Sequence, residues 1–160
     1  MSKEKAITPI LGIESAAQYW MEIVQPNFLR FNSEPTAREA FNLCSSLWHL
    51  IDWVEKDLRT NPNRLSLGDL RNQFEIKCSA LSALHDIATN SKHGGVSRPR
   101  SSIVSTKAII HSVNFYFGSS DPISEHSANY IIELSNGDQV MLHKLVEGAY
   151  LFWSNYFKPK

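Results

Sequence analysis

The stretch LCSSLWHLIDWVEKDL, residues 43–58, shows most clearly how this chain folds. Its apolar residues recur at intervals of three and four, which places them along one side of an α-helix. The stripe consists of Leu43, Leu47, Leu50, Ile51, Val54 and Leu58. Ser33 is expected to cap this helix, and Pro35 falls in its first turn, where no backbone N–H is needed. Residues 61–63, Asn-Pro-Asn, are expected to end it.

Two more helices are predicted, one on each side of this one. The first begins at Ser15 and ends or kinks before Pro26, because proline removes a backbone donor and clashes with the preceding turn. The other begins near Ser66, with Asp69 three residues later as in a capping box, and ends at the glycines 94–95. A break within residues 74–77 is left open.

The rest of the chain changes to a strand-like composition. Residues 101–117 are rich in β-branched and aromatic side chains, which indicates one or two strands. A β-hairpin is predicted over residues 130–142, with Asn136 and Gly137 in a type I′ turn. A last helix, residues 143–156, either completes a four-helix bundle or covers the sheet.

The expected fold class is therefore α+β, mainly α: three N-terminal helices, a small antiparallel sheet and a C-terminal helix. At 160 residues the chain is the size of a single domain, 1–160, with residues 1–12 as a loose lead-in. A hydrophobic content of 42% and a charged content of 20% are those of a globular protein.

Charge and cysteine content exclude several classes of protein. Sixteen basic and 16 acidic residues give a formal net charge of zero, which disfavours a globally basic nucleic-acid binder. The two cysteines form no CxxC pair, so neither a disulfide framework nor a thiolate zinc site is expected. No apolar run approaches the ~20 residues that span a bilayer, so no membrane association is expected and a cytoplasmic location is predicted. No cofactor is predicted.

A first polar cluster lies on the side of residues 43–58 opposite the leucine stripe. His49 and Asp52 are three residues apart and therefore neighbours, and Trp48 and Trp53 flank them. One interpretation is a polar site with aromatic walls. Another is a second core layer in which His49 bonds a backbone group. The two tryptophans are also a candidate protein-interaction surface, since aromatic anchors dominate interface energies.

A second polar cluster ends the next predicted helix. Asp86, Asn90 and His93 follow at i, i+4 and i+7, so they share one face, and His85 borders it. Imidazoles beside a carboxylate suit proton transfer near neutral pH. The alternative is a polar last turn in which cationic side chains complement the helix dipole. The candidate catalytic residues are His93, His85, Asp86, Asn90, His49 and Asp52; no metal site is predicted.

A local basic stretch follows the second cluster. Residues 87–120 contain no acidic residue. Arginine forks match phosphate groups, so this stretch is a candidate nucleic-acid contact, although such runs are usually solvated loops. The candidate nucleic-acid-binding residues are Lys92, Arg98, Arg100 and Lys107.

Residues 84–94, LHDIATNSKHG, resemble the helix end of HEPN-type domains, compact helical bundles of prokaryotic toxin and antiviral systems. That family carries an arginine, usually followed by a polar residue and, four to six residues later, by a histidine. Asp86 matches the polar residue and His93 the histidine, whereas His85 stands in the place of the arginine. The resemblance implies metal-independent RNA cleavage, usually in a dimer, with His93 as acid or base and Asp86 as its orienting partner.

Three functions follow as hypotheses. The first is a small accessory or interaction protein of a prokaryotic defence or toxin–antitoxin type system, with a protein partner or a second copy of itself, and RNA as a candidate ligand. The alternative is a divergent metal-independent ribonuclease that uses His93, His85 and Asp86. A more remote alternative is a metal-dependent hydrolase built on the His/Asp clusters, which has no nucleophile elbow or phosphate loop behind it.

Overall fold

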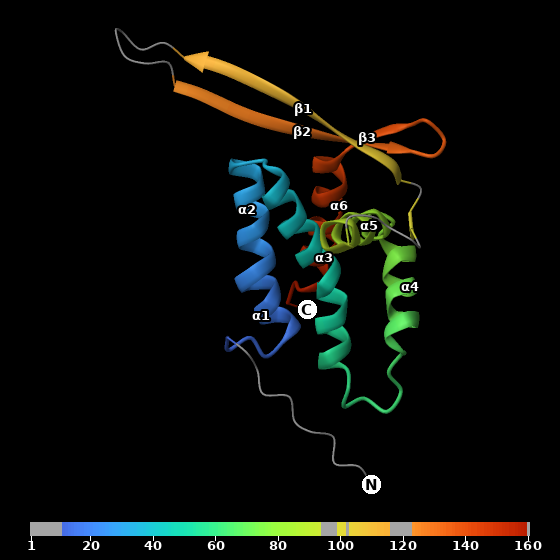
Figure 1. Ribbon diagram of the computed structural model, residues 1–160. Helices are drawn as coiled ribbons and strands as arrows, with labels where there is room; N and C mark the ends of the chain where they lie inside the picture. The colour runs from blue at the N-terminus through green and yellow to red at the C-terminus, as the bar shows by residue number, and fades with distance from the viewer. Residues whose placement is uncertain (1–10, 94–98, 102, 116–122, 160) are drawn as a thin grey trace.

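The computed structural model describes residues 11–93, 99–101, 103–115 and 123–159. For residues 91, 93, 104–115 and 123–128 it describes only the backbone. It is mainly helical with one antiparallel sheet, as predicted (Figure 1). In chain order the elements are α1 (Ala16–Tyr19), the π-helix η1 (Trp20–Val24), α2 (Gln25–Ser33), α3 (Ala37–Asp57), α4 (Leu67–Lys77), α5 (Ala80–His93), β1 (Ile103–Phe115), β2 (Ile123–Leu134), β3 (Gln139–Met141) and α6 (Leu142–Tyr156).

The first helical stretch starts where predicted but does not stop before Pro26. Ser15 caps α1, and its Oγ accepts a bond of 3.2 Å from the Gln18 N–H. Between α1 and α2 the helix widens into η1, where the Gln25 N–H bonds the Trp20 carbonyl five residues back. The wider turn gives room to a proline that lacks a donor, so the helix runs on to Ser33.

The cap of α3 is also different from the prediction. Ser33 is the last residue of α2, and its Oγ donates to the Arg30 carbonyl at 3.0 Å. Thr36 is the N-cap instead, and its Oγ1 accepts from the Glu39 N–H at 3.3 Å. The predicted stripe forms the core of the protein: Leu43, Leu47, Leu50 and Ile51 are fully buried, Val54 is 2% exposed and Leu58, beyond the helix end, is 36% exposed.

The predicted third helix is two helices. Ser66 caps α4 as expected, because its Oγ accepts from the Asp69 N–H at 3.1 Å and donates to the Asp69 carboxylate at 2.6 Å. The break comes at Cys78, whose backbone is extended, just after residues 74–77, where the sequence allows one. Figure 1 shows that α5 turns away from the direction of α4 and lies across α3.

The sheet has the order β1-β2-β3. β1 pairs with β2 from Ile103 opposite Leu134 to Phe115 opposite Ile123, whereas β3 pairs only with residues 131–133. The predicted β2–β3 hairpin is confirmed, but its turn is not type I′. Gly137 has a positive φ of 84° and Asn136 does not; Asn136 Oδ1 instead accepts from the Asp138 N–H at 3.1 Å. The loop is therefore an ordinary turn closed by a left-handed glycine.

Helix α6 both covers the sheet and packs into the helical bundle. It begins directly after β3, packs beneath the sheet and continues into the bundle beside α3 and α5 (Figure 1). Its buried residues are Leu142, Val146, Ala149 and Trp153, and Trp153 Nε1 donates to the Leu47 carbonyl at 3.2 Å. β1 and β2 extend past the helices as a two-stranded ribbon, called here the β arm (residues 103–115 and 123–134). Of the described helices, none is long and apolar enough to cross a bilayer.

Candidate functional site

Asp86 is the most heavily bonded polar side chain of the site. It is only 4% exposed, yet its carboxylate accepts bonds from the N–H groups of Arg100 (2.9 Å) and Ser101 (2.8 Å). The Ser101 hydroxyl donates to it at 2.5 Å, and His85 Nδ1 lies 2.8 Å away. Asp86 therefore anchors residues 99–101, which lead into β1, to helix α5.

These bonds also set the charge of Asp86. Burial alone would raise its pKa, but the hydrogen bonds from Arg100, Ser101 and His85 outweigh burial and hold the pKa below the ordinary value of an aspartate. Asp86 is thus ionised at neutral pH, and it favours the His85 tautomer that carries its proton on Nδ1.

Arg100 continues the same network on the outside. Its Nε and Nη2 atoms donate to the two carboxylate oxygens of Glu75 at 2.7 and 2.6 Å, and Nη2 also donates to Asn72 at 2.9 Å. The hydrogen bonds to Glu75 raise the pKa of Arg100. The guanidinium is therefore occupied by helix α4, and the predicted contact with phosphate would require it to leave Glu75.

Trp48 lies at the centre of the site. The His85 ring meets its indole edge-on with ring centroids 4.8 Å apart, and the guanidinium carbons of Arg71 and Arg100 lie 5.4 and 5.7 Å from its centroid. Such cation–π contacts stabilise a buried indole. Trp48 is 4% exposed, because the chain covers it with its own side chains, so in the single chain it offers no exposed aromatic surface. Its expected role in an interaction surface stays a prediction.

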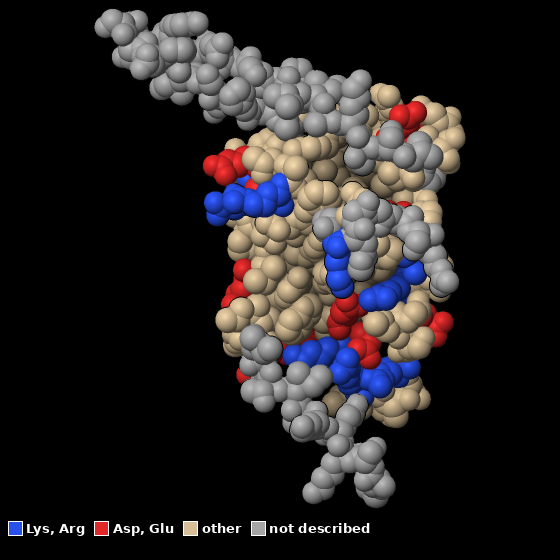
Figure 2. All heavy atoms as spheres, viewed as in Figure 1, with Lys and Arg blue, Asp and Glu red and all other residues tan. Residues whose placement is uncertain are grey.

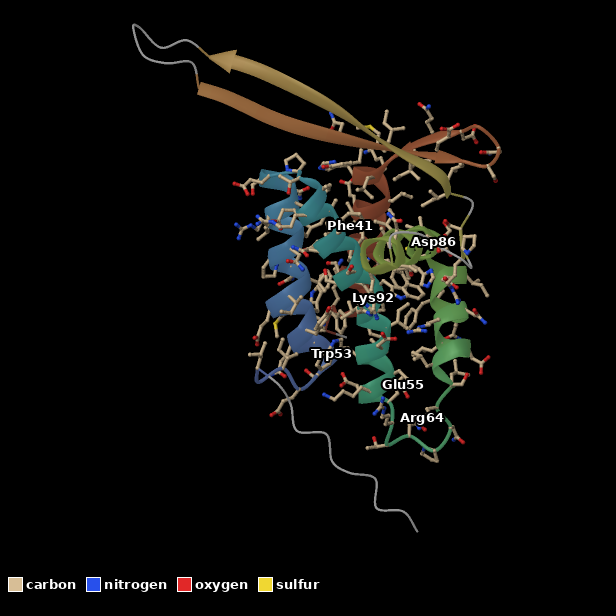
Figure 3. The ribbon with its side chains drawn as sticks, in the orientation of Figure 1. Phe41, Trp53, Glu55, Arg64, Asp86 and Lys92 are labelled. Atoms are coloured by element: carbon tan, nitrogen blue, oxygen red, sulfur yellow. The ribbon has the colours of Figure 1, made fainter. Side chains whose placement is uncertain are left out.

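Trp53, also on α3, lies in a different environment, against the first helical stretch. It is half-buried and stacks on Tyr19 with ring centroids 5.1 Å apart, while the Lys56 ammonium lies 4.5 Å from its ring. Figure 3 shows Trp53 well away from Asp86. The two tryptophans that flank His49 in the sequence thus belong to separate contacts.

The predicted pair of His49 and Asp52 is present in the structure. His49 Nδ1 lies 3.2 Å from the Asp52 carboxylate, and Arg71 Nη2 of helix α4 donates to that carboxylate at 2.7 Å. Burial by itself would raise the pKa of Asp52, but the hydrogen bonds from His49 and Arg71 outweigh burial and lower that pKa. The His49 side chain is 54% exposed. The buried Arg71 Nε atom has no hydrogen-bond partner among the described residues, so the polar groups of this cluster are less completely hydrogen-bonded than those around Asp86.

Among the described residues, the two polar clusters approach each other, but their imidazoles and carboxylates do not gather in one pocket. The contacts that connect them run from Arg71 to Trp48 and from Trp48 to His85. Asn90 and Lys92 are exposed near the end of α5. The side chains of His93 and Lys107 and the whole of Arg98 lie outside the described residues.

His85 has the geometry of an oriented base. Its Nδ1 is held by the buried Asp86, and its Nε2 lies 3.4 Å from the Thr89 hydroxyl. A carboxylate, an imidazole and a hydroxyl in this order can move a proton toward or away from the hydroxyl. The His85 side chain is 21% exposed, so part of it is accessible to solvent.

Sequence reasoning missed the residues that helix α4 and the segment before β1 bring to the site. These are Arg71, Asn72, Glu75 and Ser101. The one signal was the spacing of Arg71 and Glu75, four apart on α4 at the border of the face that carries its buried residues Leu70 and Phe74. Within the described part of the chain, no group of three or more His, Cys, Asp or Glu side chains is arranged to hold a metal ion.

Comparisons with protein-family models, with curated proteins and with solved structures found no match for this chain. The resemblance of residues 84–94 to HEPN-type domains therefore stays a prediction.

Proposed function

We propose that this chain is a non-catalytic interaction protein that associates with a second copy of itself through the β arm. The observation that carries the proposal is that the arm is long, while a third strand pairs with only a short part of it. β1 has 13 residues, about 44 Å at ~3.4 Å per residue, whereas β3 adds a third strand only to residues 131–133. A two-stranded ribbon is marginally stable by itself in water, so a partner for its edges is expected.

The described residues of the arm pack on the helical body at its base. Ile132, at the base, is 1% exposed, and α6 packs against β2 and β3 there. Farther out, the described strands pair only with each other, and Figure 1 shows them running past the bundle. The outer edge of β1 and the edge of β2 over residues 123–130 thus have no strand beside them among the described residues. Unpaired strand edges are templates for pairing with another chain.

A second copy matches these edges in charge. The sequence of β1 contains Lys107 and no acidic residue, whereas the unpaired part of β2, residues 123–130, contains Glu125 and no lysine or arginine. Pairing a β1 edge with a β2 edge of another copy brings opposite charges together, which stabilises cross-strand neighbours. The net charge of zero means that two copies do not repel each other at long range.

The charges of the helical body give less support to RNA binding. Figure 2 shows basic side chains next to acidic ones on the face that it presents. The described ion pairs include Arg30 and Arg38 with Glu39, Arg59 and Arg64 with Glu55, and Arg100 with Glu75. An RNA ligand, a role in a defence system and a cytoplasmic location remain predictions from the sequence.

Shortening the arm is expected to abolish self-association. In the variant, Asn-Gly replaces residues 109–129 and joins the paired residues Ala108 and Tyr130 by a two-residue turn. Light scattering coupled to gel filtration should show oligomers of the natural chain whose population rises with concentration, and a monomer for the variant. Circular dichroism should show that the helical body of the variant is intact.

A matched control removes apolar surface elsewhere. Ile76 on α4 is 86% exposed, and Ile76→Ser should leave the oligomers unchanged. The proposal is wrong if the natural chain is monomeric at its highest soluble concentration, or if the shortened variant associates as strongly as the natural chain.

A second candidate function, metal-independent RNA cleavage, has one specific observation in its favour, the arrangement of Asp86, His85 and Thr89. In the presence of a chelator, His85→Gln should lower RNA cleavage by the purified protein at least ~100-fold, the usual effect of losing a general base. His49→Gln is the control, because this exposed imidazole lies in the other cluster. Absence of cleavage by the natural chain would exclude the function.

A further inference from the structure

We propose that Arg100 is a releasable latch: its bonds to Glu75 and Asn72 hold the root of the β arm on the helical body, and their loss frees that root while the body stays folded. This inference rests on the proposed role of the arm in association. It concerns residues 99–101, called here the strap, which connect to the arm just before Ile103.

The strap is tied to the body at two places. The inner tie is Asp86, which accepts from the N–H groups of Arg100 and Ser101 and from the Ser101 hydroxyl. The outer tie is the Arg100 side chain, which bonds Glu75 and Asn72 of α4. Ser101 Oγ also accepts from the N–H of Ile103 at 3.3 Å, so the inner tie continues into the first residue of β1.

The two ties differ in exposure. The side chain of Asp86 is 4% exposed, whereas that of Arg100 is 31% exposed and that of Glu75 is 13% exposed. Water and dissolved ions therefore reach the outer tie first, and salt screens an exposed ion pair more than a buried one. The Arg100–Glu75 ion pair of the outer tie is therefore the contact of the strap that high salt or a competing anion can break.

The arm is irregular at the point where the strap meets it. The register between β1 and β2 shifts between Ile103 and Ser105, which is the sign of a bulge. A bulge interrupts the ladder and bends the strand. With the outer tie open, the root is still held by Asp86, by the packing of Ile103 against the core and by this irregular pairing. Motion should therefore concentrate in the strap.

Hydrogen exchange measured by mass spectrometry on the full chain tests the latch directly. Glu75→Gln removes the charge that holds Arg100, and the amides of Arg100, Ser101 and Ile103 should then exchange about tenfold faster. The natural chain in ~1 M salt, where the screening length is ~3 Å, should show the same change in smaller degree. Amides in the middle of α3, such as that of Leu50, should stay as protected as before.

Glu55→Gln is the matched control. Glu55 has a side-chain exposure of 12% and also accepts from arginines, Arg59 and Arg64, but it lies on α3 away from the strap. It should leave exchange at Arg100 and Ser101 unchanged. Equal exchange of the strap in the natural chain and Glu75→Gln, or equal acceleration by both variants, would overturn the latch.

These outcomes are separate from those of the arm replacement. Exchange of the strap reports the root of the arm in any oligomeric state, provided that samples are compared at the same concentration. If the chain does not self-associate but Glu75→Gln still speeds exchange in the strap, the proposed function is wrong and the latch is supported. If the chain self-associates through the arm but Glu75→Gln leaves exchange in the strap unchanged, the proposed function is supported and the latch is wrong.

Discussion

Replacing Asp86 by alanine is expected to lower the free energy of unfolding by about 3 kcal/mol. The loss comes from the groups that Asp86 satisfies rather than from its own size. The variant leaves the N–H groups of Arg100 and Ser101 and the Ser101 hydroxyl without their acceptor, and it takes the orienting partner from His85. Urea unfolding followed by circular dichroism measures the difference.

The effect should depend on pH with a defined sign. Because the folded-state pKa of Asp86 is lowered, its contribution is fully present above the ordinary aspartate pKa of about 3.9 and is lost as pH falls through the lower folded value. The gap between the natural chain and Asp86→Ala should therefore be constant near neutral pH and close in strong acid.

Asp52→Ala provides the comparison. Its carboxylate also has two side-chain partners, His49 and Arg71, but it is 35% exposed, so water replaces those partners and the expected loss is at most about 1 kcal/mol. Equal losses in the two variants would contradict the assignment of Asp86 as the buried anchor of the strap.

Replacing Trp48 by alanine is expected to cost more, about 3–5 kcal/mol. The indole is 4% exposed and contacts His85, Arg71 and Arg100, so its removal leaves a cavity where α3, α4 and α5 meet. Trp53→Ala should cost less, about 1–2 kcal/mol, since that ring is half-buried and loses mainly its stacking on Tyr19.

Trp48→Ala also tests whether Trp48 is a core residue or an interface residue. Trp48→Ala should lower stability without changing the oligomeric state at temperatures where it is folded, as judged by light scattering. A Trp48→Ala protein of natural stability that no longer associates would show instead that Trp48 is an interface residue.

The local features of the fold could be predicted because they depend on residues close in the chain. The leucine stripe of α3 became the core, and Ser15 and Ser66 cap helices as expected, since helical period and capping are decided within one or two turns. The errors at Pro26 and Ser33 arose where two local solutions compete. A π-turn absorbed the proline, and Thr36 rather than Ser33 became the cap.

The sequence by itself determined the pairs within each polar cluster. His49 and Asp52 are three residues apart on one helix and therefore neighbours, and His85 and Asp86 are adjacent, so both pairs lie within one helical turn. Only the tertiary structure decided that Trp48 is covered, that Asp86 holds the strap and that Arg100 reaches Glu75, 25 residues away in the chain. Those contacts depend on which faces of the helices pack together. The apolar periodicity and the capping residues of a single helix do not determine how separate helices pack.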